Sequence, residues 1–105
     1  MVLMSELPMI TPTGVDSLPG PGWMLLDVRT DAEWARGRIE GSIHIPLDQL
    51  ISRIDEVSDK VVCICAVGGR SAQATAYLIS TGREAVNLAG GIQGWAADNR
   101  PLSKG

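Results

Sequence analysis

The segment VVCICAVGGRSAQATAYL, residues 61–78, joins a β-branched run ending in cysteine to two glycines, an arginine and a serine. Glycine adopts positive φ angles at little steric cost, so Gly68 and Gly69 allow the backbone to curl tightly before a helix. A curled loop that enters a helix can turn its N–H groups inward and form an anion-binding nest. The anion nearest to such a nest is the sulfur of Cys65, and Ser71 can cap the helix or donate a further hydrogen bond.

The magnitudes indicate that hydrogen bonds, rather than the helix dipole, must ionise this thiol. A free thiol titrates near pH ~8.5, and lowering its pKa by about two units requires roughly 2.7 kcal/mol. The helix dipole supplies ~0.3–1 kcal/mol, whereas each charge-assisted hydrogen bond contributes about 1.5–3 kcal/mol. The loop contains no His, Asp or Glu that could act as a base. The loop therefore predicts nucleophilic chemistry by a preformed Cys65 thiolate, with an ordinary flexible turn as the alternative.

The second cysteine, Cys63, lies inside the apolar run, and we expect it to pack as a small hydrophobic residue. Two cysteines separated by one residue do not form a disulfide framework. With only His44 as a further soft ligand they also make a poor zinc site. We therefore expect two reduced thiols in a cytoplasmic protein, with neither a metal nor a cofactor.

Length and charge exclude several other classes of protein. A chain of 105 residues predicts a single domain, residues 1–105. The net charge of -3 and the absence of a basic run argue against nucleic acid as a partner. The apolar runs are far shorter than a membrane span, and the first ten residues, MVLMSELPMI, lack the basic start of a secretory signal. The oligomeric state does not follow from these features.

Apolar runs alternate with helix-like segments along the chain. Strands are predicted at residues 23–28, 42–46, 60–65 and 85–88, with a weaker strand at 9–11. Helices are predicted from a capping box at Thr30 and Glu33, at 47–57, at 70–80 ending before Gly82, and at 90–99, with a turn or helix at 12–18. This alternation predicts an α/β sandwich with a mostly parallel sheet.

The carboxyl ends of parallel strands meet at one edge of a sheet, so Arg29, Cys65 and residues 90–91 should lie near one another. Asp27 and Arg29 could bind substrate, but we expect an ion pair that orders the loop, either between Glu33 and Arg29 or between Asp27 and an arginine. We interpret the following side chains as structural or solvated: Trp34, Arg36, Arg38, His44 and Trp95.

With these residues identified, the sequence resembles the single-domain rhodanese family of sulfurtransferases over about residues 9–103. Three ordered segments carry the resemblance: LLDVRTDAEWARGRIEGSIHIPL, CAVGGRS and VNLAGGIQGW. The matching positions are Asp27, Arg29, Glu33, Gly37, Ile39, Gly41, Ile45, Pro46, Cys65, Gly68, Arg70, Ser71, Leu88, Gly90, Gly91 and Trp95.

The resemblance implies a three-layer sandwich in which helices flank a five-stranded, mostly parallel sheet. It also implies that Cys65 takes a sulfane sulfur from a donor such as thiosulfate or a persulfide, holds it as a persulfide, and passes it to cyanide, a thiol or a protein cysteine. Arg70 would orient the substrate and anchor the loop. The substrate-binding residues would be Ala66, Val67, Gly68, Gly69, Arg70 and Ser71.

Two alternatives to sulfur transfer remain. A related phosphatase has a loop one residue longer between its cysteine and arginine, and tyrosine phosphatases place His where this chain has Ile64, so a phosphatase-like enzyme is disfavoured. A non-catalytic sulfur-carrier or interaction domain stays open. The apolar residues Ala66 and Val67 stand where thiosulfate-using relatives often carry polar ones, so we expect weak use of thiosulfate.

Overall fold

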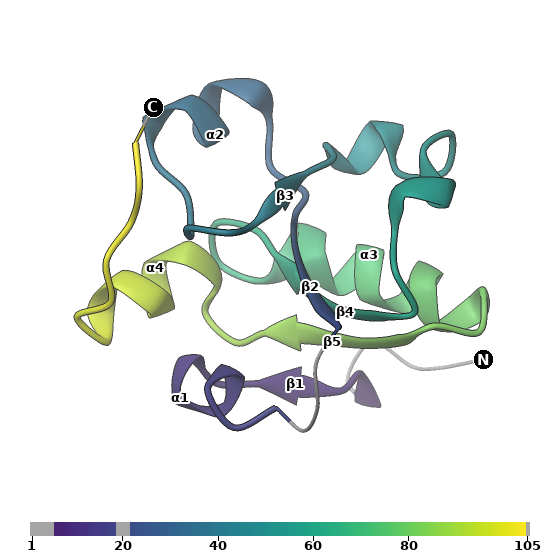
Figure 1. Ribbon diagram of the computed structural model, residues 1–105, viewed down its shortest axis with the longest axis horizontal. Helices are drawn as coiled ribbons and strands as arrows, with labels where there is room; N and C mark the ends of the chain where they lie inside the picture. Colours follow the sequence, from purple (N-terminus) through teal and green to yellow (C-terminus); the bar gives the residue numbers. More distant parts are fainter. Residues whose placement is uncertain (1–5, 19–21, 105) are drawn as a thin grey trace.

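The computed structural model describes residues 6–18 and 22–104 and contains a five-stranded sheet with the strand order β1-β5-β4-β2-β3 (Figure 1). Every pairing between neighbouring strands is parallel, which confirms the predicted α/β architecture. The strands are β1 (Met9–Ile10), β2 (Trp23–Asp27), β3 (Ile43–His44), β4 (Lys60–Ile64) and β5 (Glu84–Leu88). The helices are α1 (Pro12–Val15), α2 (Asp31–Arg36), α3 (Gly69–Ser80) and α4 (Gly91–Ala97). Residues 1–5 of the start that we interpreted as non-secretory lie outside the described residues.

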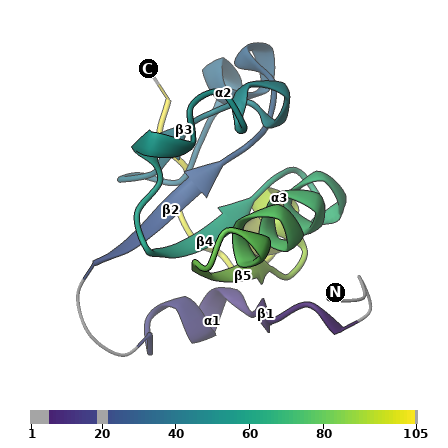
Figure 2. The ribbon, with the colours of Figure 1, turned by 90° about the vertical axis from the view of Figure 1, so that its right-hand side faces the viewer.

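The central strand β4 is covered on both faces, which explains its unbroken apolar sequence. Val61 and Cys63 face α3 and pack with its Leu78, whereas Val62 and Ile64 pack on the opposite side with Trp95 of α4. Successive residues of a strand point to opposite faces, so a fully apolar run suits a strand buried on both sides. Figure 2 shows α3 on one side of the sheet and α1 toward the other.

The capping box predicted at the start of α2 is present. Thr30 accepts a hydrogen bond from the Glu33 N–H at 3.3 Å, and the Glu33 carboxylate accepts one from the Thr30 N–H at 3.1 Å. Two backbone donors at the helix start are satisfied in this way. The box fixes the beginning of α2 next to the edge where β2 and β4 end.

The prediction of a single amphipathic helix at residues 47–57 was wrong. The segment forms two short 3₁₀ helices, η2 (Leu47–Gln49) and η3 (Ile54–Glu56). Leu47 and Leu50 are three residues apart, as are Ile54 and Val57, and a spacing of three is the period of a 3₁₀ helix. Each pair turns toward the core, whereas Ile51, which the predicted helix placed on its buried face, is 70% exposed.

The remaining elements agree with the predicted ones to within a few residues at their ends. The strand predicted at 42–46 spans two residues, and the helix predicted at 90–99 begins one residue later and ends two residues earlier. Helix α3 ends before Gly82, as predicted. Within residues 6–18 and 22–104, no helix is both long enough and apolar enough to cross a membrane.

Candidate functional site

The site lies at the edge of the sheet where β2, β4 and β5 end. Val28, directly after β2, donates its N–H to the Ile64 carbonyl at 2.9 Å, so the segment that leads to Arg29 runs beside the end of β4. Cys65 follows β4 directly, and the start of α4 reaches it from β5 through the Ile92 N–H, which donates to the Cys65 carbonyl at 2.8 Å. The three segments predicted to share this edge therefore lie together.

The sulfur of Cys65 is enclosed by the loop that follows it. The Gly68 N–H donates to Sγ at 3.0 Å, and the Ser71 hydroxyl lies 3.2 Å from the same atom. Gly68 has a φ of 111°, a left-handed conformation that folds the loop back over the sulfur before α3 begins at Gly69. Only 1% of Cys65 is exposed, so the loop covers the thiol almost completely.

This enclosure favours the ionised form of Cys65. Burial is the largest single influence on the thiol and opposes ionisation. The hydroxyl of Ser71 and the amides of Ser71, Gly68 and Val67 act in the opposite direction, and together they hold the pKa of Cys65 below its ordinary value. The main-chain and side-chain donors of the loop therefore offset the cost of burying a sulfur anion.

The neighbouring Cys63 has the opposite character. It is fully buried, and desolvation raises the pKa of its thiol to about 12, although a hydrogen bond from Thr75 acts in the other direction. Cys63 packs with Leu26 and Leu78 in the core that lies against α3. It is a packing residue that stays protonated where Cys65 ionises.

The N-terminus of α4 holds the loop in its inward-facing conformation. The Ile92 and Gln93 N–H groups donate to the carbonyls of Cys65 and Ala66 at 2.8 and 3.1 Å. In a planar trans peptide the N–H points opposite to the carbonyl, so tying the Ala66 carbonyl to α4 leaves the Val67 amide facing the other way, where it acts on the sulfur. Gly91 makes this approach possible, because a Cβ at this position would lie 2.3 Å from the Cys65 carbonyl oxygen.

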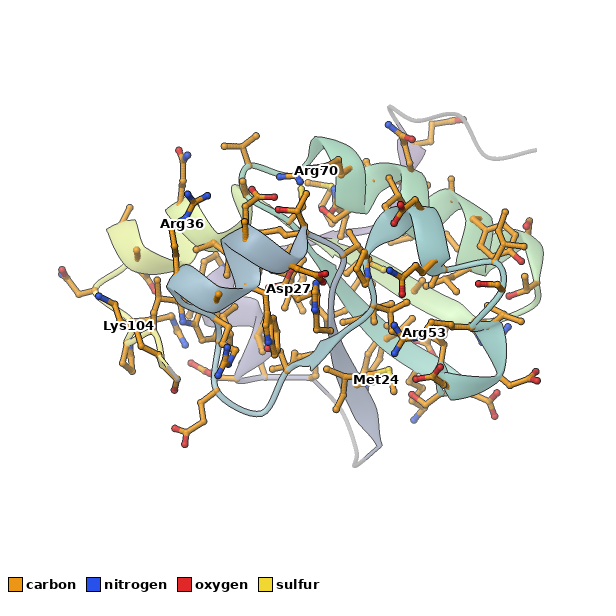
Figure 3. The ribbon with its side chains drawn as sticks, turned by 90° about the horizontal axis from the view of Figure 1, so that it is seen from above. Met24, Asp27, Arg36, Arg53, Arg70 and Lys104 are labelled. Carbon is orange, nitrogen blue, oxygen red and sulfur yellow. The ribbon has the colours of Figure 1, made fainter. Side chains whose placement is uncertain are left out.

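Two arginines flank the loop, and each is paired with a carboxylate. Arg70 lies at the start of α3 (Figure 3). It forms a two-point ion pair with Glu33 of α2, at 2.6 and 2.9 Å. The Arg70 hydrogen bond is the main reason why the pKa of Glu33 is lowered to about 2. Arg29 is buried and donates to Asp27 at 2.8–3.0 Å and to the Gly37 carbonyl at 2.7 Å. The structure contains an Asp27–Arg29 pair, whereas the Glu33 carboxylate binds Arg70, and Arg29 donates to the backbone carbonyl of Glu33 at 3.3 Å.

Asn87 of β5 belongs to the same cluster, although the sequence analysis did not identify it. It is 2% exposed, its Oδ1 lies 2.5 Å from the Ser71 hydroxyl, and its Nδ2 donates to the Gly68 carbonyl at 3.0 Å. The available signal was a polar residue in the otherwise apolar run AVNL, just before the turn that leads to α4.

Trp34 of α2 lies between His44 of β3 and Arg38, which follows α2. Trp34 lies against His44 with a ring separation of 4.7 Å, and His44 Nε2 lies 2.8 Å from the Arg29 carbonyl oxygen. The guanidinium of Arg38 lies 4.6 Å from the centre of the Trp34 ring. We expected both Arg36 and Arg38 to be solvated. Arg36 is exposed, but the expectation was wrong for Arg38, which is half-buried against Trp34.

Two cavities open on either side of the loop. One, of about 450 Å³, lies between the segment after β2 and the segment around η2, and Arg70 lines it. The other, of about 260 Å³, is lined by Ala66 together with Arg36 and Gln93. Arg29 lines both cavities, so both lie beside the segment that follows β2.

A parallel sheet with a cysteine-bearing loop at its carboxyl edge defines the class of this protein, and comparisons with known proteins agree. Residues 12–98 match the family described as "Rhodanese-like domain", and the chain belongs to the rhodanese family, as its resemblance predicted. A solved rhodanese-related protein from Thermoplasma volcanium superimposes with a TM-score of 0.84 at 32% identity, covering 91% of this chain and 97% of that one.

Three curated relatives indicate the type of activity. A sulfurtransferase of Allochromatium vinosum is 42% identical over 82 residues, covering 75% of this chain and 77% of that protein. Thiosulfate sulfurtransferase GlpE of Pseudomonas fluorescens is 30% identical over 95 residues, covering 88% and 87%. A putative sulfur carrier protein, YrkF of Bacillus subtilis, is 32% identical over 74 residues, covering 68% of this chain and 40% of that protein. The two sulfurtransferases support a sulfurtransferase-type role.

Proposed function

We propose that this protein is an enzyme that moves a sulfane sulfur from a donor to a thiophilic acceptor through a persulfide on Cys65. The observation that carries the proposal is the loop around Cys65, in which Gly68 and Ser71 contact a sulfur whose pKa is lowered without a neighbouring base. A site that stabilises a thiolate is suited to nucleophilic attack on sulfur. The remaining members of the cradle are Ala66, Val67, Gly69 and Arg70.

The cycle has two displacements at sulfur. In the first, the Cys65 thiolate attacks the outer sulfur of the donor. A new S–S bond forms, the donor's bond to that sulfur breaks, and the electron pair leaves with the donor as sulfite or as a thiolate. In the second, cyanide or a thiolate attacks the bound sulfur, and the electron pair returns to Sγ. Neither step needs an external oxidant, reductant, metal or cofactor.

The surroundings of Arg70 favour a donor of low charge. Glu33 already occupies two donor positions of the Arg70 guanidinium, so a dianion such as thiosulfate meets a largely neutralised cation. Val67 at the outer side of the loop is 60% exposed and apolar. The preferred donor is therefore a persulfide carried by a small thiol or by a protein, which a single cytoplasmic domain would meet in solution.

Formation of thiocyanate from thiosulfate and cyanide tests the proposal. We expect measurable turnover in the wild type, none in Cys65→Ser, and nearly unchanged turnover in the matched control Cys63→Ala, since Cys63 lies in the core. Thermal unfolding of all three proteins checks that they are folded. Turnover that survives in Cys65→Ser would exclude Cys65 as the sulfur carrier, and a thiosulfate KM in the low micromolar range would contradict the donor preference.

A non-catalytic sulfur carrier is the second candidate function. The relationship to a putative sulfur carrier protein favours it. Mass spectrometry separates the two functions. A carrier would gain one sulfur atom on Cys65 from a protein persulfide donor but would form no thiocyanate, whereas the enzyme would do both.

A further inference from the structure

Asn87 is a buried polar residue that has no part in the cycle described above. It lies on β5, and its side chain reaches the Cys65 loop at two points, the Ser71 hydroxyl at 2.5 Å and the Gly68 carbonyl at 3.0 Å. The Met9 sulfur lies 3.6 Å from its nitrogen. Asn87 therefore touches two residues that contact the catalytic sulfur, without contacting the sulfur itself.

The hydrogen-bond chemistry fixes the orientation of this amide. A carbonyl oxygen can only accept, so the Asn87 nitrogen must face Gly68 and the Asn87 oxygen must face Ser71. The Asn87 oxygen can also only accept, so the proton between the two side chains belongs to Ser71. A hydroxyl has one proton, and Ser71 therefore cannot donate to Asn87 and to the Cys65 sulfur 3.2 Å away at the same time.

We propose that Asn87 is a positioning residue that controls, through the single hydroxyl proton of Ser71, how strongly the loop binds the Cys65 sulfur anion. While Sγ carries an added sulfur it is uncharged, and the Ser71 hydroxyl donates its hydrogen bond to Asn87 Oδ1. When an acceptor removes that sulfur, the electron pair returns to Sγ, and the hydroxyl turns to donate to it. The proton never leaves Ser71, and only its direction changes.

The consequence for Cys65 follows from this competition. Every time Ser71 donates to the thiolate it gives up its bond to Asn87, so Asn87 weakens the stabilisation of the anion. A thiolate that is bound less tightly is a better nucleophile, because nucleophilicity falls as the pKa of a thiol falls. This consequence for catalysis rests on the proposed sulfur transfer, whereas the effect on ionisation of Cys65 does not.

The variant Asn87→Leu removes the acceptor while keeping the approximate shape of the side chain. The Gly68 carbonyl then still accepts the Ala72 N–H at 3.1 Å, and Ile92 and Gln93 still hold the loop from α4. The charged groups that face the loop also remain, namely Arg70 and Glu33 and the buried Asp27–Arg29 pair. Ser71 is left with Sγ as its partner, and we expect the ionisation constant of Cys65 to rise about three- to tenfold.

Titration of the ultraviolet thiolate absorbance tests the proposal in the wild type, Asn87→Leu, Ser71→Ala and the double variant. Cys63 stays silent, because its pKa is raised to about 12. We expect Asn87→Leu to move the Cys65 transition to lower pH when Ser71 is present and to leave it unmoved in the Ser71→Ala background. Equal shifts in both backgrounds, or a shift to higher pH, would overturn the proposal.

Two controls separate this effect from damage to the fold. Leu88→Val removes one methylene from the adjacent residue on the opposite face of β5, and we expect it to leave the titration unchanged. If Asn87→Leu lacks a cooperative thermal transition, Asn87→Ala takes its place in the same four-protein comparison. If the wild type formed no thiocyanate, the proposed function would be contradicted. The titration would still test the effect of Asn87 on the ionisation of Cys65, which does not depend on that function.

Discussion

Arg70 and Glu33 lie 37 residues apart in the chain and form a two-point ion pair, with Nη1–Oε1 at 2.6 Å and Nη2–Oε2 at 2.9 Å. Only 21% of the Glu33 side chain and 36% of the Arg70 side chain is exposed. The pair ties the first turn of α3, which carries the Cys65 loop, to the first turn of α2. The pair holds the Arg70 side chain against α2, and the Glu33 carboxylate largely neutralises its charge.

Releasing Arg70 from this pair should improve the use of thiosulfate. Gln can replace Glu in a capping box, so Glu33→Gln keeps the start of α2 while removing the negative charge. The partly exposed guanidinium of Arg70, once unpaired, would contribute about 1 kcal/mol to the binding of the thiosulfate dianion. The thiosulfate KM should therefore be about fivefold lower. Steady-state kinetics measures this change. The matched control is Glu56→Gln, which breaks the exposed pair with Arg53, and an equal change in both variants would contradict the explanation.

The same pair should make the stability of the fold depend on pH in acid. The Arg70 hydrogen bond, with help from Thr30, lowers the pKa of Glu33 from 4.5 to about 2. Because the pKa in the folded state is lowered, the stabilisation is fully present above the unfolded value of 4.5 and is lost as the pH falls toward 2. Urea unfolding should show the wild type about 1–2 kcal/mol more stable than Glu33→Gln at neutral pH, because solvent screens a partly exposed pair. This difference in unfolding free energy should shrink below pH 4.5. A difference that stays constant down to pH 3 would show that the charge of Glu33 does not stabilise the fold.

The fold was largely predictable, because its strands are buried on both faces. The mainly apolar strands that end at Asp27, Ile64 and Leu88 have no helical periodicity, and polar or glycine-rich residues follow each of them within a few positions. The segment at 47–57 was mispredicted, because apolar residues three and four apart fit an α-helix as well as they fit two 3₁₀ turns. Only the packing of Leu50 and Val57 against the core, with Ile51 left in solvent, distinguishes the two.

The parallel topology correctly placed the three strand ends together, but individual side-chain contacts were predictable only near Cys65. Cys65, Gly68 and Ser71 lie close together in the sequence, so their spacing alone indicates that they surround one sulfur. The contacts of Ser71 with Asn87 and of Arg70 with Glu33 join elements 16 and 37 residues apart. Their existence depends on the distances between packed elements, which residue types and spacing do not specify.

The two thiols should titrate far apart. The hydrogen bonds of the loop lower the pKa of Cys65, whereas burial raises the pKa of Cys63 to about 12. Ultraviolet titration should show one thiolate forming below the usual thiol range, absent in Cys65→Ser and retained in Cys63→Ala. Cys63→Ala should lower the free energy of unfolding by about 1 kcal/mol and leave the reactivity of Cys65 unchanged. If the thiolate transition at low pH disappeared in Cys63→Ala, the reactive thiol would be Cys63, and the prediction would be contradicted.

Gly91 should be essential for the reactivity of Cys65, because α4 approaches the loop through it. In Gly91→Ala the new Cβ would lie 2.3 Å from the Cys65 carbonyl oxygen and 2.7 Å from the Ala66 carbonyl, at a φ of +56°. Either α4 or the loop must move, and the amides that face the sulfur turn away with it. Loss of one charge-assisted hydrogen bond, about 1.5 kcal/mol, predicts a Cys65 ionisation constant and a transfer rate at least about tenfold lower.

The matched control for this variant is Gly82→Ala. Gly82 also has a left-handed φ, +91°, but a Cβ there meets no atom within 4 Å, and the residue follows α3 at the far end from Cys65. Both variants should lose about 1–2 kcal/mol from backbone strain in thermal unfolding, since a side chain is disfavoured in this conformation. Only Gly91→Ala should also shift the thiolate titration to higher pH. A normal titration in Gly91→Ala would mean that the loop keeps its inward-facing amides without the support of α4.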